Sequence, residues 1–113
     1  MTQLTLTQEQ VNNIVAEAMQ EANKAAREFL AVHGDRDCCG FAWTNIYKIK
    51  GNTKLGKMLK AAGVRQDYTK AFQLWNPAKL PTQSLNVLEE GARAAAEVFR
   101  KYGFEAYAGS RLD

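Results

Sequence analysis

The sequence predicts a single α+β domain in which a small three-stranded, mainly antiparallel sheet is covered by helices, in the order α-β-α-β-α-β. Two observations predict this class. Residues 8–33 contain no Pro or Gly and carry apolar residues at helical spacing, and short segments rich in aromatic and β-branched residues follow between turn signals. With 113 residues, 46% of them hydrophobic and 24% charged, the chain suffices for one domain, which we expect over residues 1–113.

The first predicted element is a long N-terminal helix over residues 8–33. Thr7 and Gln10 have the spacing of a capping box, and Gly34 ends the segment. The apolar residues of this helix recur at alternating spacings of four and three, which places them on one stripe. The stripe consists of Val11, Val15, Ala18, Ala22, Ala25, Phe29 and Val32. Its small Ala positions permit the close approach of another helix.

The middle of the chain predicts two strands, over residues 40–49 and 70–75, separated by a short helix that Thr53 caps and that runs to Ala62. Alternation divides the first strand into two faces. One face carries Phe41, Trp43, Asn45 and Tyr47, and the other carries Ala42, Thr44, Ile46 and Lys48. Because both faces mix apolar and polar residues, the pattern leaves open which of them is buried.

The last part of the chain predicts a helix from an N-cap at Asn86 to Tyr102, followed by a third strand over residues 104–108 and a tail over residues 109–113. The helix carries a seam of Gly and Ala residues, and Glu97 is spaced to pair with Lys101. A small sheet and two Ala-rich helices leave much apolar surface for a chain of this size. We therefore expect self-association.

Charge and hydropathy restrict the partners. The net charge of +3 gives mild attraction to polyanions without the dense basic runs of a dedicated nucleic-acid-binding protein. Six lysines between residues 48 and 70, together with Trp43 and Tyr47, are compatible with a surface for single-stranded nucleic acid, but solvated lysines are the simpler interpretation. The chain shows neither a membrane-spanning segment nor a signal peptide, so we expect a soluble cytoplasmic protein that binds no membrane.

Catalytic, metal and cofactor motifs are absent from the sequence. His33, Cys38 and Cys39 are the only cluster of metal-ligand types, and adjacent cysteines do not match the spacing of zinc sites. Asp35 and Asp37 flank Arg36 in a turn, where Asp is favoured for its local hydrogen bonds, so a turn role is preferred over a general acid–base pair. We therefore expect no catalytic residues, no metal and no cofactor, and a protein that binds rather than an enzyme.

Two segments are candidates for binding. The exit of the second strand places Trp75 and Asn76 at the start of a loop, where binding groups collect. In the tail, Arg111 and Asp113 combine a guanidinium fork for phosphate with a carboxylate that accepts from hydroxyls. The alternatives stay open: core packing for Trp75 with a turn role for Asn76, and a frayed or locally ion-paired tail.

Several short motifs together resemble a widespread family of small bacteriophage proteins. The motifs are Cys39-Gly-Phe-Ala-Trp43, Phe72-Gln-Leu-Trp-Asn-Pro77, Gln83-Ser84, the Ala-rich last helix and Tyr107-Ala-Gly-Ser-Arg-Leu-Asp113. The pattern is similar to that of the anti-Thoeris sponge family, which sequesters cyclic ADP-ribose isomers. The resemblance covers residues 39–113; the long first helix and the Cys38–Cys39 pair match no family pattern.

The resemblance implies a phage anti-defence protein in the host cytoplasm that binds a cyclic nucleotide immune signal without degrading it. It also implies a homo-oligomer, either a dimer or a hexamer built from dimers, with cyclic oligonucleotides as ligands of some members at separate sites. The ligand-binding residues that it implies are Trp75, Asn76, Arg111, Asp113, Phe41 and Ser110. The alternative is a small phage interaction module that binds and inhibits a host protein or nucleic acid.

Overall fold

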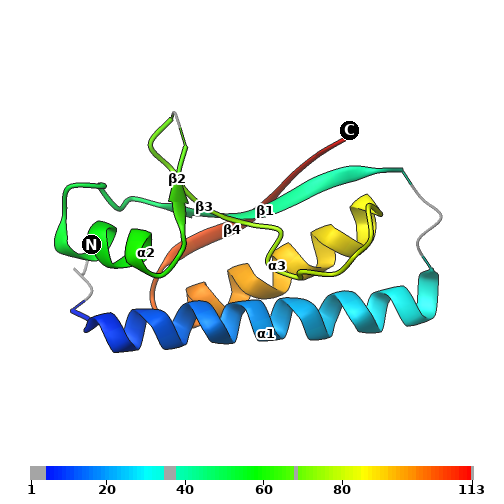
Figure 1. Ribbon diagram of the computed structural model, residues 1–113, viewed down its shortest axis with the longest axis horizontal. Helices are drawn as coiled ribbons and strands as arrows, with labels where there is room; N and C mark the ends of the chain where they lie inside the picture. Colours follow the sequence, from blue (N-terminus) through cyan, green and yellow to red (C-terminus); the bar gives the residue numbers. More distant parts are fainter. Residues whose placement is uncertain (1–4, 35–37, 68, 113) are drawn as a thin grey trace.

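The structure, a computed structural model, describes residues 5–34, 38–67 and 69–112 and forms an α+β fold (Figure 1). Its elements are α1 (Gln8–His33), β1 (Gly40–Tyr47), α2 (Lys54–Ala61), β2 (Arg65–Gln66), β3 (Phe72–Trp75), α3 (Leu85–Lys101) and β4 (Glu105–Leu112). The predicted class, the long N-terminal helix and the antiparallel sheet are confirmed. The predicted number of strands is wrong, because the sheet has four strands rather than three.

The sheet has the order β2-β3-β1-β4, and each neighbouring pair is antiparallel. Residues 40–112 therefore run β-α-β-β-α-β with β1 and β3 at the centre, which is the ferredoxin-like, split β-α-β arrangement. The long helix α1 precedes this unit. The topology matters for function because the two central strands display their side chains in the middle of one open face.

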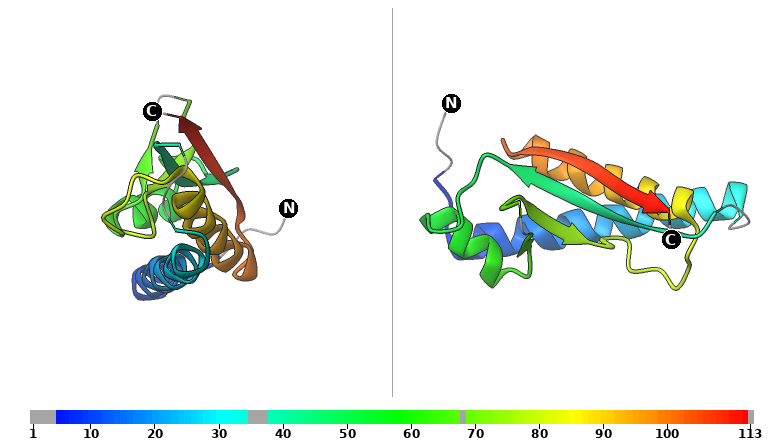
Figure 2. Two further views of the ribbon diagram at one scale, coloured as in Figure 1. Left: turned by 90° about the vertical axis from the view of Figure 1, so that its right-hand side faces the viewer. Right: turned by 90° about the horizontal axis from the view of Figure 1, so that it is seen from above.

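The helices lie on one side of the sheet, and α1 runs along α3 (Figures 1 and 2). Six residues of α1 are buried there: Val11, Ile14, Val15, Ala18, Ala22 and Ala26. A Cβ atom on Gly91 of α3 would lie 2.7 Å from the Ala78 Cβ and 3.2 Å from the Ala22 carbonyl oxygen. The small residues of α1 and α3 are thus buried against other parts of the same chain. They give no support to the self-association that we expected from them.

The apolar stripe of α1 departs from the prediction toward its C-terminal end. Ala26 is buried in place of Ala25, and Val32 is 78% exposed. An almost heptad pattern drifts around a straight helix by about 20° per heptad, which moves its later positions away from the partner helix. In addition, α1 has 26 residues and α3 only 17, and the last turn of α1 extends past α3 (Figure 1).

The element ends were predicted with mixed success. The capping box of Thr7 with Gln10 and the cap of α2 at Thr53 are confirmed. The predicted cap of the last helix at Asn86 is wrong, because the helix begins at Leu85 and the Ser84 hydroxyl accepts from the Val87 amide.

The central strands are shorter than predicted. β1 ends at Tyr47, because Lys48 adopts a positive φ of 65°, and β3 begins at Phe72, after Lys70 with a φ of 71°. The last strand is longer than predicted, because the segment expected to be a tail belongs to β4 as far as Leu112. The sheet consequently carries the C-terminal segment in register with β1, and Arg111 is fixed opposite Phe41.

Candidate functional site

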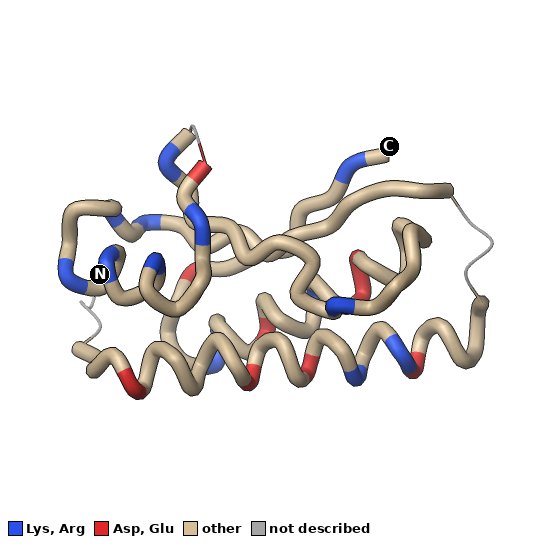
Figure 3. Tube along the Cα trace, in the orientation of Figure 1, with Lys and Arg blue, Asp and Glu red and all other residues tan. Residues whose placement is uncertain are grey.

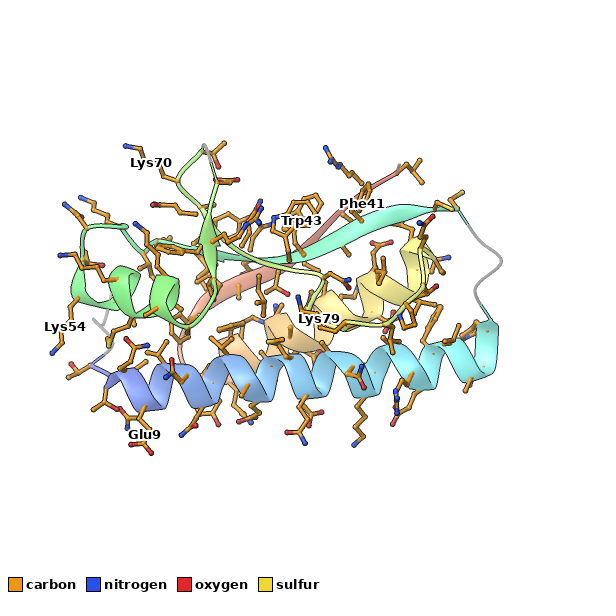
Figure 4. The ribbon with its side chains drawn as sticks, viewed as in Figure 1. Glu9, Phe41, Trp43, Lys54, Lys70 and Lys79 are labelled. Atoms are coloured by element: carbon orange, nitrogen blue, oxygen red, sulfur yellow. The ribbon has the colours of Figure 1, made fainter. Side chains whose placement is uncertain are left out.

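The two faces of β1, which the sequence pattern left undecided, are distinguished by burial. Ala42, Thr44 and Ile46 are fully buried against the helices, and the Thr44 hydroxyl donates to the Ala92 carbonyl of α3 at 2.9 Å. The alternating residues Phe41 and Trp43 point to the opposite side (Figure 4). We call that side of the sheet, with Phe41, Trp43, Asn45, Tyr47, Gln73, Trp75, Tyr107 and Arg111, the outer face.

A pair of tryptophans forms the centre of the outer face. Trp43 of β1 and Trp75 of β3 are directly opposite each other, with ring centroids 5.0 Å apart and ring planes inclined by 37°. Gly109 of β4 lies on the other side of Trp43. A Cβ atom on Gly109 would lie 2.6 Å from Trp43 Nε1, so the glycine allows the indole to lie close against β4.

Amide side chains hold both indoles in place. The Trp43 Nε1–H donates to Asn45 Oδ1, and the Trp75 Nε1–H donates to Gln73 Oε1, both at 3.1 Å. The Gln73 amide in turn donates to Asp67 Oδ2 at 3.1 Å. Because each ring nitrogen already has a partner, what remains for a ligand is the aromatic surface of the rings.

Asp67 is a structural residue of the β2–β3 hairpin in addition to its bond with Gln73. Its Oδ1 accepts from the backbone amides of Thr69 and Ala71, at 2.9 and 3.0 Å, and from the Thr69 hydroxyl at 2.7 Å. An Asp that accepts from backbone amides further along the chain is typical of a turn. These contacts fix the turn that joins β2 to β3.

Two further ring clusters lie along β1. Next to the tryptophan pair, the Arg111 guanidinium lies 5.4 Å from the centroid of the Phe41 ring. Toward the other end of the strand, Tyr47 and Tyr107 have ring centroids 6.2 Å apart, and the Arg100 guanidinium lies 5.4 Å from the Tyr107 centroid. Phe41, Tyr47 and Tyr107 are 40%, 39% and 51% exposed, so part of each ring is accessible to a ligand.

A hollow of about 450 Å³ opens over the tryptophan pair. Its lining residues are Trp43, Arg65, Gln66, Asp67, Gln73, Trp75 and Arg111, and we call it the tryptophan hollow. Two guanidinium groups, from Arg65 and Arg111, thus border an aromatic surface. Such a combination suits a flat, anionic ligand, because the rings stack on its planar part and the guanidinium forks bind its charged oxygens.

The structure brings together three of the six residues implied by the resemblance. Trp75 and Arg111 line the tryptophan hollow, and Phe41 lies beside it under the Arg111 guanidinium. Ser110 is paired with Ala42 and therefore lies on the face that packs against α3. Asp113 lies outside the described residues.

Asn76 is not a lining residue of the tryptophan hollow. It follows β3 with a positive φ of 43°, and its backbone amide donates to the Ala42 carbonyl at 3.0 Å. Its Oδ1 atom is buried and has no hydrogen-bond partner among the described residues. Asn tolerates a left-handed backbone better than most residues. The positive φ of Asn76 therefore agrees with the turn role that the sequence offered as the alternative to ligand binding.

The predicted ligand-binding residues did not include four residues of the site, Trp43, Arg65, Gln73 and Gly109. Trp43 had been considered only with Tyr47, for a nucleic-acid surface. The signal for Trp43 was present, because alternation in β1 places it on the same face as Phe41. Arg65 belongs to the two-residue strand β2, which is too short to produce a pattern. Gln73 and Gly109 act through their partners across the sheet, and these become known only with the register.

Charge is unevenly distributed over the fold (Figure 3). Residues 40–84 carry eight Lys and Arg side chains against a single Asp, whereas α1 carries four Glu against one Lys and one Arg. Helix α3 carries three Glu against two Arg and one Lys and is therefore balanced. The modest net charge of +3 therefore conceals a strongly basic segment over residues 40–84, most of it in α2 and the loops, beside an acidic α1, and this basic segment favours an anionic ligand.

Other kinds of site find little support in the part of the chain that the structure describes. Cys38 and Cys39 are exposed free thiols, and the described side chains contain no group of three His, Cys, Asp or Glu able to hold a metal ion. None of the described helices combines the length and hydropathy needed to cross a membrane.

Comparison with known proteins finds no matching family model, no matching curated protein and no matching solved structure.

Proposed function

We propose that the protein binds a nucleotide on the outer face of its sheet and holds it without converting it. The observation that carries this proposal is the tryptophan pair Trp43–Trp75 bordered by Arg65 and Arg111. Stacking of a base on an aromatic side chain contributes about 1–3 kcal/mol. A guanidinium binds phosphate through two parallel hydrogen bonds, which adds orientation to charge.

In this mode of binding, the base stacks on the indoles and the phosphates lie between the two guanidinium groups. Asn45 and Gln73 fix the indoles before the ligand arrives, so little side-chain freedom is lost on binding. The Asp67 carboxylate is engaged by the hairpin and by Gln73. A protein that sequesters its ligand needs affinity and no general acid, general base or nucleophile at the reacting atoms.

Cyclic ADP-ribose isomers are the first ligands to test, because the resemblance to the anti-Thoeris sponge family implies them. They have the chemistry that the tryptophan hollow suits, namely an adenine ring and a pyrophosphate. Sequestration would keep the signal from the defence effector of the host. The same proposal includes a homo-oligomer. This part depends on the resemblance alone, because the small-residue faces of α1 and α3 are buried within the chain and are not available to a second copy.

The experiment is native mass spectrometry of protein purified from cells that co-express an active TIR signalling enzyme. We expect a retained ligand whose mass matches the intact signal, recovered unchanged after denaturation, together with the subunit number. A variant with Trp75→Ala serves as the control and should retain less ligand. Recovery of a degraded product, or a wild-type protein without ligand in the presence of the signal, would refute the proposal.

A further inference from the structure

A second hollow, of about 720 Å³, adjoins the first at the end of the central strands. Its lining residues are Lys48, Ile49, Lys50, Gly51, Asn52, Lys60, Gln66 and Lys70, and we call it the lysine basin. Four ammonium groups line it and no acidic side chain does. Gln66 lines both hollows, so the lysine basin continues the surface of the tryptophan hollow.

The backbone brings the lysines of the basin together from three segments. Lys48 and Lys70 follow and precede the paired central strands, both with left-handed backbone. The Gln66 amide donates to the Lys70 carbonyl at 3.0 Å, and a Cβ atom on Gly51 would lie 2.5 Å from Gln66 Oε1, so hairpin and loop are in close contact. The convergence of charge therefore follows from the fold.

The positive charge of the basin is largely uncompensated. Lys48 forms an ion pair with Glu105 at 3.5 Å. Among the described residues, Lys50, Lys60 and Lys70 have no carboxylate partner, and Lys60 approaches only the Gly51 carbonyl, at 3.5 Å. Because the ammonium groups of the lysine basin repel one another, a bound polyanion would stabilise them by neutralising their charge.

We propose that the outer face binds single-stranded nucleic acid several nucleotides long. Its bases stack on the clusters of Phe41, of Trp43 with Trp75, and of Tyr47 with Tyr107, and its phosphates continue into the lysine basin. The proposal depends on the proposed function in one point, the stacking of a base on the tryptophan pair. It extends that function from one nucleotide to a strand and contradicts our expectation that nucleic acid is the less favoured partner.

Three observations select a single strand as the occupant. Rings in three clusters along one strand offer several stacking positions, and only unpaired bases expose the faces that stack. The charge of residues 40–84 is strongly positive, as a phosphate backbone requires. Finally, aromatic residues on the central strands of a four-stranded sheet are the arrangement with which RNA-recognition domains stack bases, although this third point is an analogy of fold.

The test is fluorescence anisotropy with labelled oligothymidylates of roughly two, four, eight and twelve nucleotides, of which the longer three lie within known site sizes. We expect the affinity to rise with length until the strand covers both hollows, and to fall steeply with salt. A duplex of the longest length should bind more weakly than its single strand. Equal affinity for all lengths, or tighter binding of the duplex, would overturn the inference.

The basin is tested with the double variant Lys50→Ala/Lys70→Ala. It should weaken the binding of the longest strand by about tenfold or more, reduce its salt slope by about 1.4, and leave the dinucleotide unaffected. The matched control is Lys24→Ala/Lys57→Ala, which removes two exposed lysines outside both hollows.

The two proposals fail in different ways. If cyclic ADP-ribose isomers bind and Trp75→Ala weakens their binding, while the oligothymidylates bind without dependence on length or on the basin lysines, the strand proposal is refuted and the proposed function stands. If neither nucleotides nor oligothymidylates bind, both are refuted.

Discussion

Trp43 and Trp75 lie opposite each other on the two central strands, with ring centroids 5.0 Å apart, and each indole N–H is held by an amide oxygen. This pair connects the sequence to the proposed function. Both residues lie on the side of the sheet that no described helix covers, and the guanidinium groups of Arg65 and Arg111 border them.

Truncation of the binding groups should weaken the binding of a nucleotide. Trp75→Ala and Arg111→Ala should each cost about 1–3 kcal/mol, the usual range for a stacked aromatic or a charged hydrogen bond. Calorimetric titration with a cyclic ADP-ribose isomer measures the change. Unchanged affinity in both variants would remove the tryptophan hollow from consideration.

Ser110 provides the matched control for Arg111. It is the neighbour of Arg111 in β4 but belongs to the face that packs against α3. Ser110→Ala should therefore bind the ligand with wild-type affinity in the same titration. A loss comparable to that of Arg111→Ala would favour the role implied by the resemblance over the geometry of the sheet.

Gly109→Ala should displace the Trp43 indole. The added Cβ atom would lie 2.6 Å from Trp43 Nε1 and 2.8 Å from Asn45 Nδ2, so at least one side chain must leave its present rotamer. Such a departure costs about 0.5–1.5 kcal/mol, and we expect nucleotide affinity to fall by a similar amount. In a Trp43→Phe background the same substitution should cost less, because the smaller ring relieves the contact; an equal cost would contradict this explanation.

Gly91→Ala should destabilise the packing of α3 against the loop that connects it to β3. An alanine in the interior of a helix stabilises it relative to glycine by about 0.5–1 kcal/mol. At this position, however, the methyl group would lie 2.7 Å from the Ala78 Cβ, and overpacking costs about 1–3 kcal/mol. The free energy of unfolding from urea titration should therefore fall. An increase would show that α3 does not lie as close to Ala78 as the structure places it.

Glu17 should make the stability of the protein depend on pH. Its side chain forms an ion pair with Lys101 and accepts from the Tyr102 hydroxyl at 2.5 Å, so it joins α1 to the end of α3. The hydrogen bonds from Lys101 and then from Tyr102 lower the pKa of Glu17 below its ordinary value of 4.5. A lowered pKa means stabilisation that is present above pH 4.5 and is lost as the pH falls through the folded-state pKa.

The variant Glu17→Gln should therefore have a lower Tm than the wild type at neutral pH, and the difference should shrink in acid. The pKa values of Lys101 and Tyr102 are raised by their hydrogen bonds with Glu17, so their part is lost only in strong alkali. Glu28→Gln, an exposed Glu on the same helix, is the control and should leave the Tm unchanged. A Tm difference for Glu17→Gln that is independent of pH would contradict the assignment.

Local signals predicted much of the fold. Glycine, proline and capping residues fixed the existence of all three helices, and the capping box at Thr7 was confirmed in detail. The short strand Arg65–Gln66 was missed because two residues give no periodicity. Lys101 illustrates another limit: helical spacing predicts a pair with Glu97, whereas the ion pair reaches Glu17 on a helix distant in sequence.

The candidate site was predicted only in part, because it depends on the register of the strands. Trp75 and Arg111 were identified from their residue types, yet the sequence gives no indication that Trp43 faces Trp75 or that Gly109 lies against Trp43. Ser110 was placed with Arg111 by adjacency, although adjacent residues in a strand point to opposite faces. The sequence thus indicated which residue types could bind a ligand, but it did not indicate which of them the strand register brings together.

The most direct test of the central claim uses the intrinsic fluorescence of the protein. The chain has two tryptophans, and both belong to the pair on the outer face, so tryptophan emission reports on this site alone. Titration with a cyclic ADP-ribose isomer and with an oligothymidylate should quench the emission saturably, and Arg111→Ala should shift the midpoint to higher concentration while Ser110→Ala leaves it in place. Binding detected by calorimetry without any change in emission would place the ligand elsewhere and contradict the account.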